Sequence, residues 1–279
     1  MFSSFMINTW VVATIVAAVA GCVGFFVVVR GATFAAHTLP LGTFPGAAAA
    51  SLIGVNPVFG LVAFSVVGVI GINRLSRRGR PEVATALCLV TLLGLGALFL
   101  SMTSEYSQEV YALLFGEVLG VSNSDFAPIA IMSAVSIAVI VLLFRPLLLT
   151  AVSPELAQAR GVSSKRIDLW FLAILALSTS MAVPVVGALL VFSLTVGPAS
   201  AARSLSDRPV VAMLMSVGIS LVTVWAAIAL SYESNWPVGF FVGALGAISY
   251  ALGRLVAGAG GRRGLRIVAV ARRERPHLR

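Results

Sequence analysis

Side chains that could bind a cation or move a proton are rare in this sequence of 279 residues. It contains two histidines, His37 and His277, and the second lies close to the C-terminal end. His37 stands beside an apolar run, and imidazole is a good ligand for Zn²⁺ and an acceptable one for Mn²⁺. We therefore take His37 as a candidate metal contact. The alternative is an imidazole that only hydrogen-bonds a backbone carbonyl freed by a nearby proline.

The sequence shows no catalytic constellation. It has no Gly-x-x-x-x-Gly-Lys-Ser/Thr motif for nucleotide phosphates, and its one lysine, Lys165, has no glycine-rich surroundings. No nucleophile stands with a histidine in a recognisable arrangement. We expect that this chain is not an enzyme and that it binds no cofactor of its own.

Acidic residues gather around a short apolar run, Val110–Val121. They are Glu105, Glu109, Glu117 and Asp125, and no basic residue opposes them in this part of the chain. Such a group predicts a negatively charged entrance that attracts cations or meets basic residues of a delivery protein. The alternative is a solvated loop.

The composition predicts an all-α polytopic membrane protein. Hydrophobic residues make up 59% of the chain and charged residues 10%, whereas a water-soluble domain carries about 25% charged residues. We expect nine membrane-spanning helices: Thr9–Val29, Leu39–Leu52, Pro57–Ile72, Val83–Met102, Phe126–Phe144, Leu169–Val183, Val185–Ala199, Val210–Leu230 and Val238–Val256. Val110–Val121 is too short to cross a core of about 30 Å, so we expect a re-entrant segment there.

The distribution of charge predicts the orientation. If the C-terminus is cytoplasmic, all 19 Lys and Arg residues lie inside or at the inner interface, and the charged residues of the outer segments are all acidic. The N-terminus is then outside. We expect a membrane domain over residues 1–256 and a basic cytoplasmic tail over residues 257–279 that contacts anionic lipids, with no nucleic-acid partner.

The second apolar run is interrupted by Pro40, Gly42, Pro45 and Gly46. Proline removes a backbone donor and clashes with the preceding turn, so we expect a broken or kinked helix. Broken helices often line a transport path, although a proline kink can also serve packing alone. The region from Pro184 to Pro198 shows the same pattern.

A polar segment, residues 153–166, separates two long apolar runs. Ser153, Pro154 and Glu155 are typical of a helix start, and Gly161 is typical of a residue just past a helix end. We expect a short surface helix, Pro154–Arg160, that is available to dock into another protein. The alternative is an ordinary loop.

These residues carry a resemblance to a known family. The pattern formed by Pro154, Glu155, Ala157 and Gly161, followed by the motif from Val186 to Ala202, resembles the integral-membrane permease of zinc- and manganese-type ABC importers. The resemblance implies ATP-driven import of Mn²⁺ or Zn²⁺ by a homodimer or pseudo-dimer in a prokaryotic plasma membrane. It also implies that the short helix is the coupling helix for an ATP-binding subunit, and that an extracytoplasmic metal-binding protein delivers the ion.

One motif departs from the family. Its permeases are similar to each other in an Asp-x-x-x-His-x-x-x-Pro-Gly pattern that serves the ion path. Aligned on Pro45 and Gly46, the two ligand positions are His37 and Leu41 here. Three explanations stay open: one ligand has moved by a helical turn, the path is built differently, or the substrate has changed.

Two other functions remain open from the sequence. A secondary carrier usually needs acids inside the membrane, and none of the ten acids here falls in the middle of a predicted span. A membrane assembly subunit would have no transport path, against which the interrupted second span and the acidic entrance argue.

Overall fold

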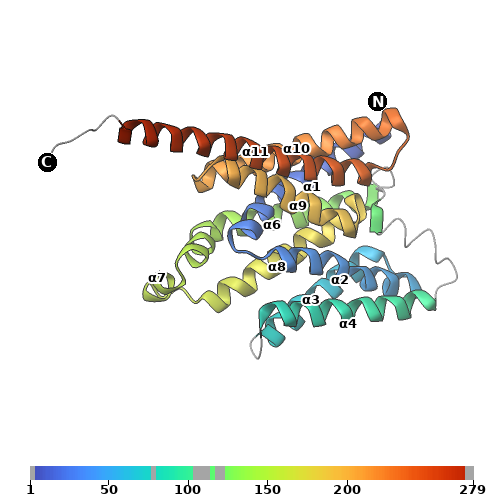
Figure 1. Ribbon diagram of the computed structural model, residues 1–279. Helices are drawn as coiled ribbons and strands as arrows, with labels where there is room; N and C mark the ends of the chain where they lie inside the picture. Colours follow the sequence, from blue (N-terminus) through green and yellow to red (C-terminus); the bar gives the residue numbers. More distant parts are fainter. Residues whose placement is uncertain (1–3, 77–79, 103–113, 117–122, 274–279) are drawn as a thin grey trace.

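The chain folds into a bundle of long helices (Figure 1). The computed structural model describes residues 4–76, 80–102, 114–116 and 123–273. Within these ranges there are ten helices and no strand: α1 (Ser4–Val29), α2 (Thr33–Leu52), α3 (Pro57–Ser76), α4 (Pro81–Ser101), α6 (Asn123–Val152), α7 (Pro154–Ala159), α8 (Ser164–Val186), α9 (Ala188–Leu205), α10 (Pro209–Ser234) and α11 (Val238–Arg273). The predicted all-α fold is confirmed.

Eight of these helices are long and apolar enough to cross a membrane, namely α1, α3, α4, α6, α8, α9, α10 and α11. In the apolar 18-residue stretches of α1 and α8, 67% of the residues are buried within the chain, whereas in that of α11 only 17% are buried. Helices α1 and α8 therefore form the centre of the bundle. The outer helices leave large apolar surfaces open, as expected where lipid is the solvent.

Helix α2 corresponds to the one remaining predicted span, Leu39–Leu52, and it is less apolar than the eight helices named above. Its 20 residues reach about 30 Å, which is enough to cross the hydrocarbon core. Most of its side chains are buried against α3, α4, α8 and α9. A helix enclosed by protein does not need a lipid-facing surface, which explains its lower hydropathy.

Of the break or kink expected in α2, the break is wrong, and the kink stays a prediction. The backbone stays helical from Thr33 to Leu52, with Pro40 and Pro45 inside the helix. The hydroxyl of Thr43 donates a hydrogen bond of 2.7 Å to the Pro40 carbonyl. The carbonyls that lose a helical N–H donor to the two prolines are those of Ala36 and Leu41, four residues earlier. Close packing on all sides holds the remaining turns, as neighbours do for many membrane helices that contain proline.

The chain breaks instead at Gly187, between α8 and α9. Gly187 has φ +91°, and Val183 accepts a hydrogen bond from its N–H at 2.8 Å. The backbone of Phe115 and Gly116 lies directly against this joint, where a Cβ atom on Gly187 would collide. The separation of two spans in this region is thus confirmed, with the joint three residues later than Pro184. Of the predicted re-entrant segment, Val110–Val121, only residues 114–116 are among those described.

The start of α1 and the end of α11 lie at opposite ends of the bundle (Figure 1), as an odd number of crossings requires. Helix α7 lies at the same end of the bundle as the end of α11, the end of α3 and the start of α4; we call this the α7 end. Helix α11 continues beyond Val256 to Arg273, so the first part of the predicted tail is helical.

Candidate functional site

Helix α7 is a short, capped turn between two spanning helices. The Ser153 hydroxyl accepts a hydrogen bond of 3.4 Å from the Leu156 N–H, and Pro154 occupies the first turn. Gly161 has φ +75°, and the Val162 N–H donates to the Ala157 carbonyl at 2.9 Å, which closes the helix. The predicted start, the predicted stop and the positive φ of Gly161 are all confirmed.

The two faces of α7 differ in exposure. Pro154, Glu155 and Leu156 are exposed, as is Gly161, whereas Ala157 is completely buried. Ala157 therefore anchors the helix to the bundle. Of the four motif residues, the other three form an exposed surface at the α7 end.

Arg30 joins the two helices that flank α7, and the sequence did not single it out. It follows α1 directly, and its side chain is only 8% exposed. One guanidinium nitrogen donates to the Leu147 carbonyl and the Thr150 hydroxyl, each at 2.8 Å. The other donates to the Asp168 carboxylate, and the guanidinium lies over the Phe171 ring, 5.1 Å from its centroid.

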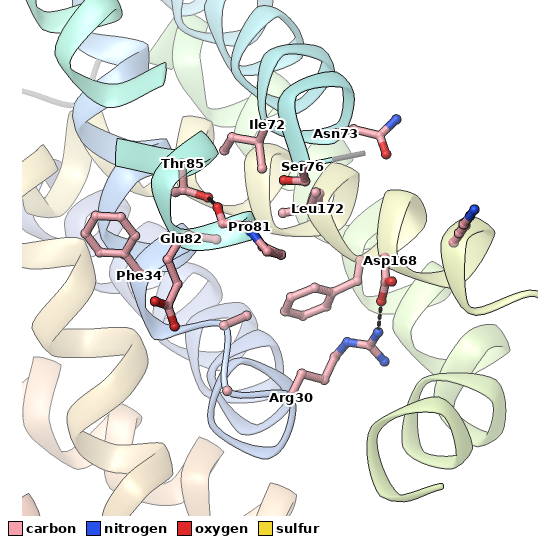
Figure 2. Close-up of a pocket in the computed structure, with 15 residues that line it drawn as sticks. Arg30, Phe34, Ile72, Asn73, Ser76, Pro81, Glu82, Thr85, Asp168 and Leu172 are labelled. Atoms are coloured by element: carbon pink, nitrogen blue, oxygen red, sulfur yellow. Dashed lines mark hydrogen bonds and ion pairs between the residues drawn. The ribbon is translucent and has the colours of Figure 1, made fainter. Parts of the chain in front are cut away.

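A cavity of about 610 Å³ opens beside this cluster at the α7 end (Figure 2). It lies where α1, α2, α3, α4 and α8 come together, and Arg30, Asp168 and Phe171 form part of its wall. Polar atoms of Glu82 and Thr85 also line it, from the first turns of α4. The cavity offers both signs of charge and an apolar wall within one opening.

His37 lies near this cavity but not in its lining. It follows Phe34, which does line the cavity, by three residues, or about one helical turn. Its ring packs edge-on against Phe192 of α9, with 5.1 Å between ring centroids. Its Nδ1 atom is buried, and so is the Thr38 hydroxyl, and neither has a hydrogen-bond partner in the described part of the chain.

The second position of the family's motif, Leu41, is buried and apolar. No group of three His, Cys, Asp or Glu side chains among the described residues could hold a metal ion. His37 therefore does not belong to a group of three such side chains in the described part of the protein.

The predicted acidic entrance falls largely outside the described residues. This applies to Glu105, Glu109 and Glu117. The backbone of Asp125 belongs to the first turn of α6, but its side chain is not described. The entrance stays a prediction.

The fold is that of a polytopic helical membrane protein with a short, capped and largely exposed helix at one end. Residues 2–256 match the ABC 3 transport family. The chain belongs to this family.

Named relatives extend this assignment. The manganese import system permease protein ScaB of Streptococcus pneumoniae is 28% identical over 253 residues, covering 91% of each chain. The high-affinity zinc uptake system membrane protein ZnuB of Haemophilus influenzae is 26% identical over 210 residues, covering 75% of this chain and 80% of its own. These relatives confirm the resemblance to zinc- and manganese-type importers.

A solved structure agrees with the fold. A chain of PsaBC from Streptococcus pneumoniae, solved in complex with Fab, superposes with a TM-score of 0.81 at 22% identity. The match covers 90% of this chain and 91% of the other.

Proposed function

We propose that this chain is the membrane-spanning permease subunit of an ATP-driven importer for Mn²⁺ or Zn²⁺. The observation that carries the proposal is similarity over nine-tenths of the chain to a manganese import permease. The exposed motif of α7 supports it, because Pro154, Glu155 and Gly161 are available to a partner at one end of the bundle.

The proposed assembly contains two copies of this chain and a separate ATP-binding subunit that docks on α7. An extracytoplasmic metal-binding protein delivers the ion at the opposite end, where the acids around Val110–Val121 attract it. The α7 end faces the cytoplasm in this arrangement, because the basic residues collect at helix ends there.

Within the permease we propose that His37 contacts the passing ion. A buried nitrogen without a partner costs about 1–3 kcal/mol relative to a satisfied one, so Nδ1 is a costly feature unless something binds it. Neighbouring hydroxyls and backbone carbonyls, or residues from the second copy, would supply the remaining oxygen ligands that Mn²⁺ accepts.

Copurification tests the docking of the ATP-binding subunit. We would coexpress the permease with the ATP-binding subunit of the same transporter and purify through a tag on the permease. Glu155→Arg reverses an exposed charge in the first turn of α7, and we expect it to reduce the captured ATPase by roughly threefold to tenfold.

The matched control is Glu233→Arg, which reverses an exposed charge near the end of α10, at the other end of the bundle. It should leave the captured ATPase unchanged. Equal capture by wild type and by both variants would remove α7 as the docking element.

A further inference from the structure

The contacts of Arg30 connect three parts of the chain that meet at the α7 end. Leu147 and Thr150 belong to the last turns of α6, just before α7, and Asp168 belongs to the first turns of α8, just after it. Arg30 follows the last residue of α1 and is the first of the three residues that connect α1 to α2. A single side chain therefore holds both flanks of α7 against the junction of α1 and α2.

The guanidinium is well suited to this position. Its planar fork presents several fixed N–H donors, and here they reach acceptors on two helices at once while the face covers Phe171. A lysine ammonium also has three N–H donors, but all three lie on one nitrogen, and it has no planar face to cover Phe171. The arginine geometry, and not only its charge, links α6 to α8.

This cluster is also part of the cavity wall. Arg30, Asp168 and Phe171 all line the cavity, and Figure 2 shows the contact between Arg30 and Asp168. A movement of α7 that shifts α6 and α8 relative to α1 would pull on these contacts, and it would change the mouth of the cavity and the start of α2, which carries His37.

We propose that Arg30 is a positioning residue that couples α7 to the cavity at the α7 end. It transmits movement of the docked ATPase from the flanks of α7 to the α1–α2 junction. The inference rests on the proposed function, since it assumes that an ATP-binding subunit docks on α7.

The test measures coupling and not only folding. The complete transporter, permease with ATP-binding subunit, is reconstituted in proteoliposomes with its binding protein, and Mn²⁺ transported per ATP hydrolysed is recorded. Asp168→Asn and Arg30→Lys should lower this ratio by about fivefold or more, with ATPase capture and basal ATP hydrolysis retained. Asp168→Asn keeps Arg30 and its bonds to α6, so it spares most of the local packing.

The chain offers a matched control in a second ion pair. Arg203 and Asp207 lie on the surface at the same end of the bundle, with 3.9 Å between a guanidinium nitrogen of Arg203 and a carboxylate oxygen of Asp207. The Asp207 side chain is fully exposed. Asp207→Asn and Arg203→Lys should keep the wild-type ratio. If the contact between Arg30 and Asp168 served folding alone, Asp168→Asn and Arg30→Lys would lower the amount of assembled transporter. The Mn²⁺ transported per ATP hydrolysed would then stay unchanged.

The outcomes separate the two proposals. A wild-type ratio in Asp168→Asn would overturn the coupling role of Arg30, whatever the yield of the Arg30 variants. Failure of the wild-type permease to capture the ATP-binding subunit would instead overturn the proposed function. The inference is supported if Asp168→Asn lowers the ratio of Mn²⁺ transported per ATP hydrolysed and Asp207→Asn leaves it at the wild-type value.

Discussion

The imidazole of His37 carries a buried Nδ1 atom for which the described residues supply no hydrogen-bond partner. Removing it by His37→Ala should lower Mn²⁺ uptake by about tenfold or more, because loss of a residue that merely supports a metal ligand already weakens metal binding by about 10–100-fold. His37→Asp restores the carboxylate that the family carries there and should keep more uptake than His37→Ala. Uptake is measured in cells at matched permease levels.

The control for this prediction is the amount of ATP-binding subunit captured by each variant, which should stay constant. Leu41→His restores the second family position and should raise uptake or change the preference between Mn²⁺ and Zn²⁺. Wild-type uptake by His37→Ala would take His37 out of the ion path and leave backbone carbonyls of α2 as the candidates.

At Gly161 the backbone alone sets the constraint. Its φ is +75° and no atom lies within 4 Å of an added Cβ. Gly161→Val should therefore strain the end of α7 by about 1–3 kcal/mol without a collision, and should reduce ATPase capture. Gly161→Asn is the matched variant, because asparagine tolerates positive φ; it should keep capture near the wild-type level. Equal loss in both variants would show that φ is not the cause.

At the scale of elements, the joint between α8 and α9 depends on Gly187. Positive φ and the backbone of Gly116 both oppose a side chain there. Gly187→Ala should lower the free energy of unfolding by about 2 kcal/mol or more, with strain and overpacking both contributing. Thermal unfolding of the purified protein would measure this loss.

Gly218 provides the comparison, because it lies within α10 with open space around it. Gly218→Ala should be neutral or slightly stabilising, since alanine is the better helix former. A Gly187→Ala protein as stable as the Gly218→Ala protein would show that the joint relaxes easily.

The sequence predicted those elements that depend on local chemistry. The start and stop of α7 follow from Ser153, Pro154 and Gly161, and the spans follow from runs of apolar residues. The contact of Arg30 with Leu147 joins residues 117 positions apart, and no periodicity reports such a pairing. The break expected in α2 was wrong for a related reason: proline weakens an isolated helix, but the neighbours that enclose α2 were not visible in its own sequence.

At the scale of the whole molecule, topology and charge agree. Arg30 directly follows α1, Arg74 lies in the last turn of α3, and Arg203 lies in the last turn of α9. The alternating direction of the spans brings all three to the α7 end. Reporter fusions after Arg80 and after Arg208 should therefore report the cytoplasm. Fusions near Gln108 and Asn235 should report the outside, because these positions follow an outward span. An outside signal at Arg80 would contradict the predicted number of spans.

The central claim is that this chain moves a divalent metal ion with energy from a partner's ATP hydrolysis. The most direct measurement is Mn²⁺ uptake into proteoliposomes that contain the permease and its ATP-binding subunit, with the binding protein outside the vesicle and ATP supplied on the α7 side. We predict uptake that requires ATP and stops when the ATPase is inactivated. Uptake that proceeds without ATP, driven by an ion gradient alone, would contradict the account and identify a secondary carrier instead.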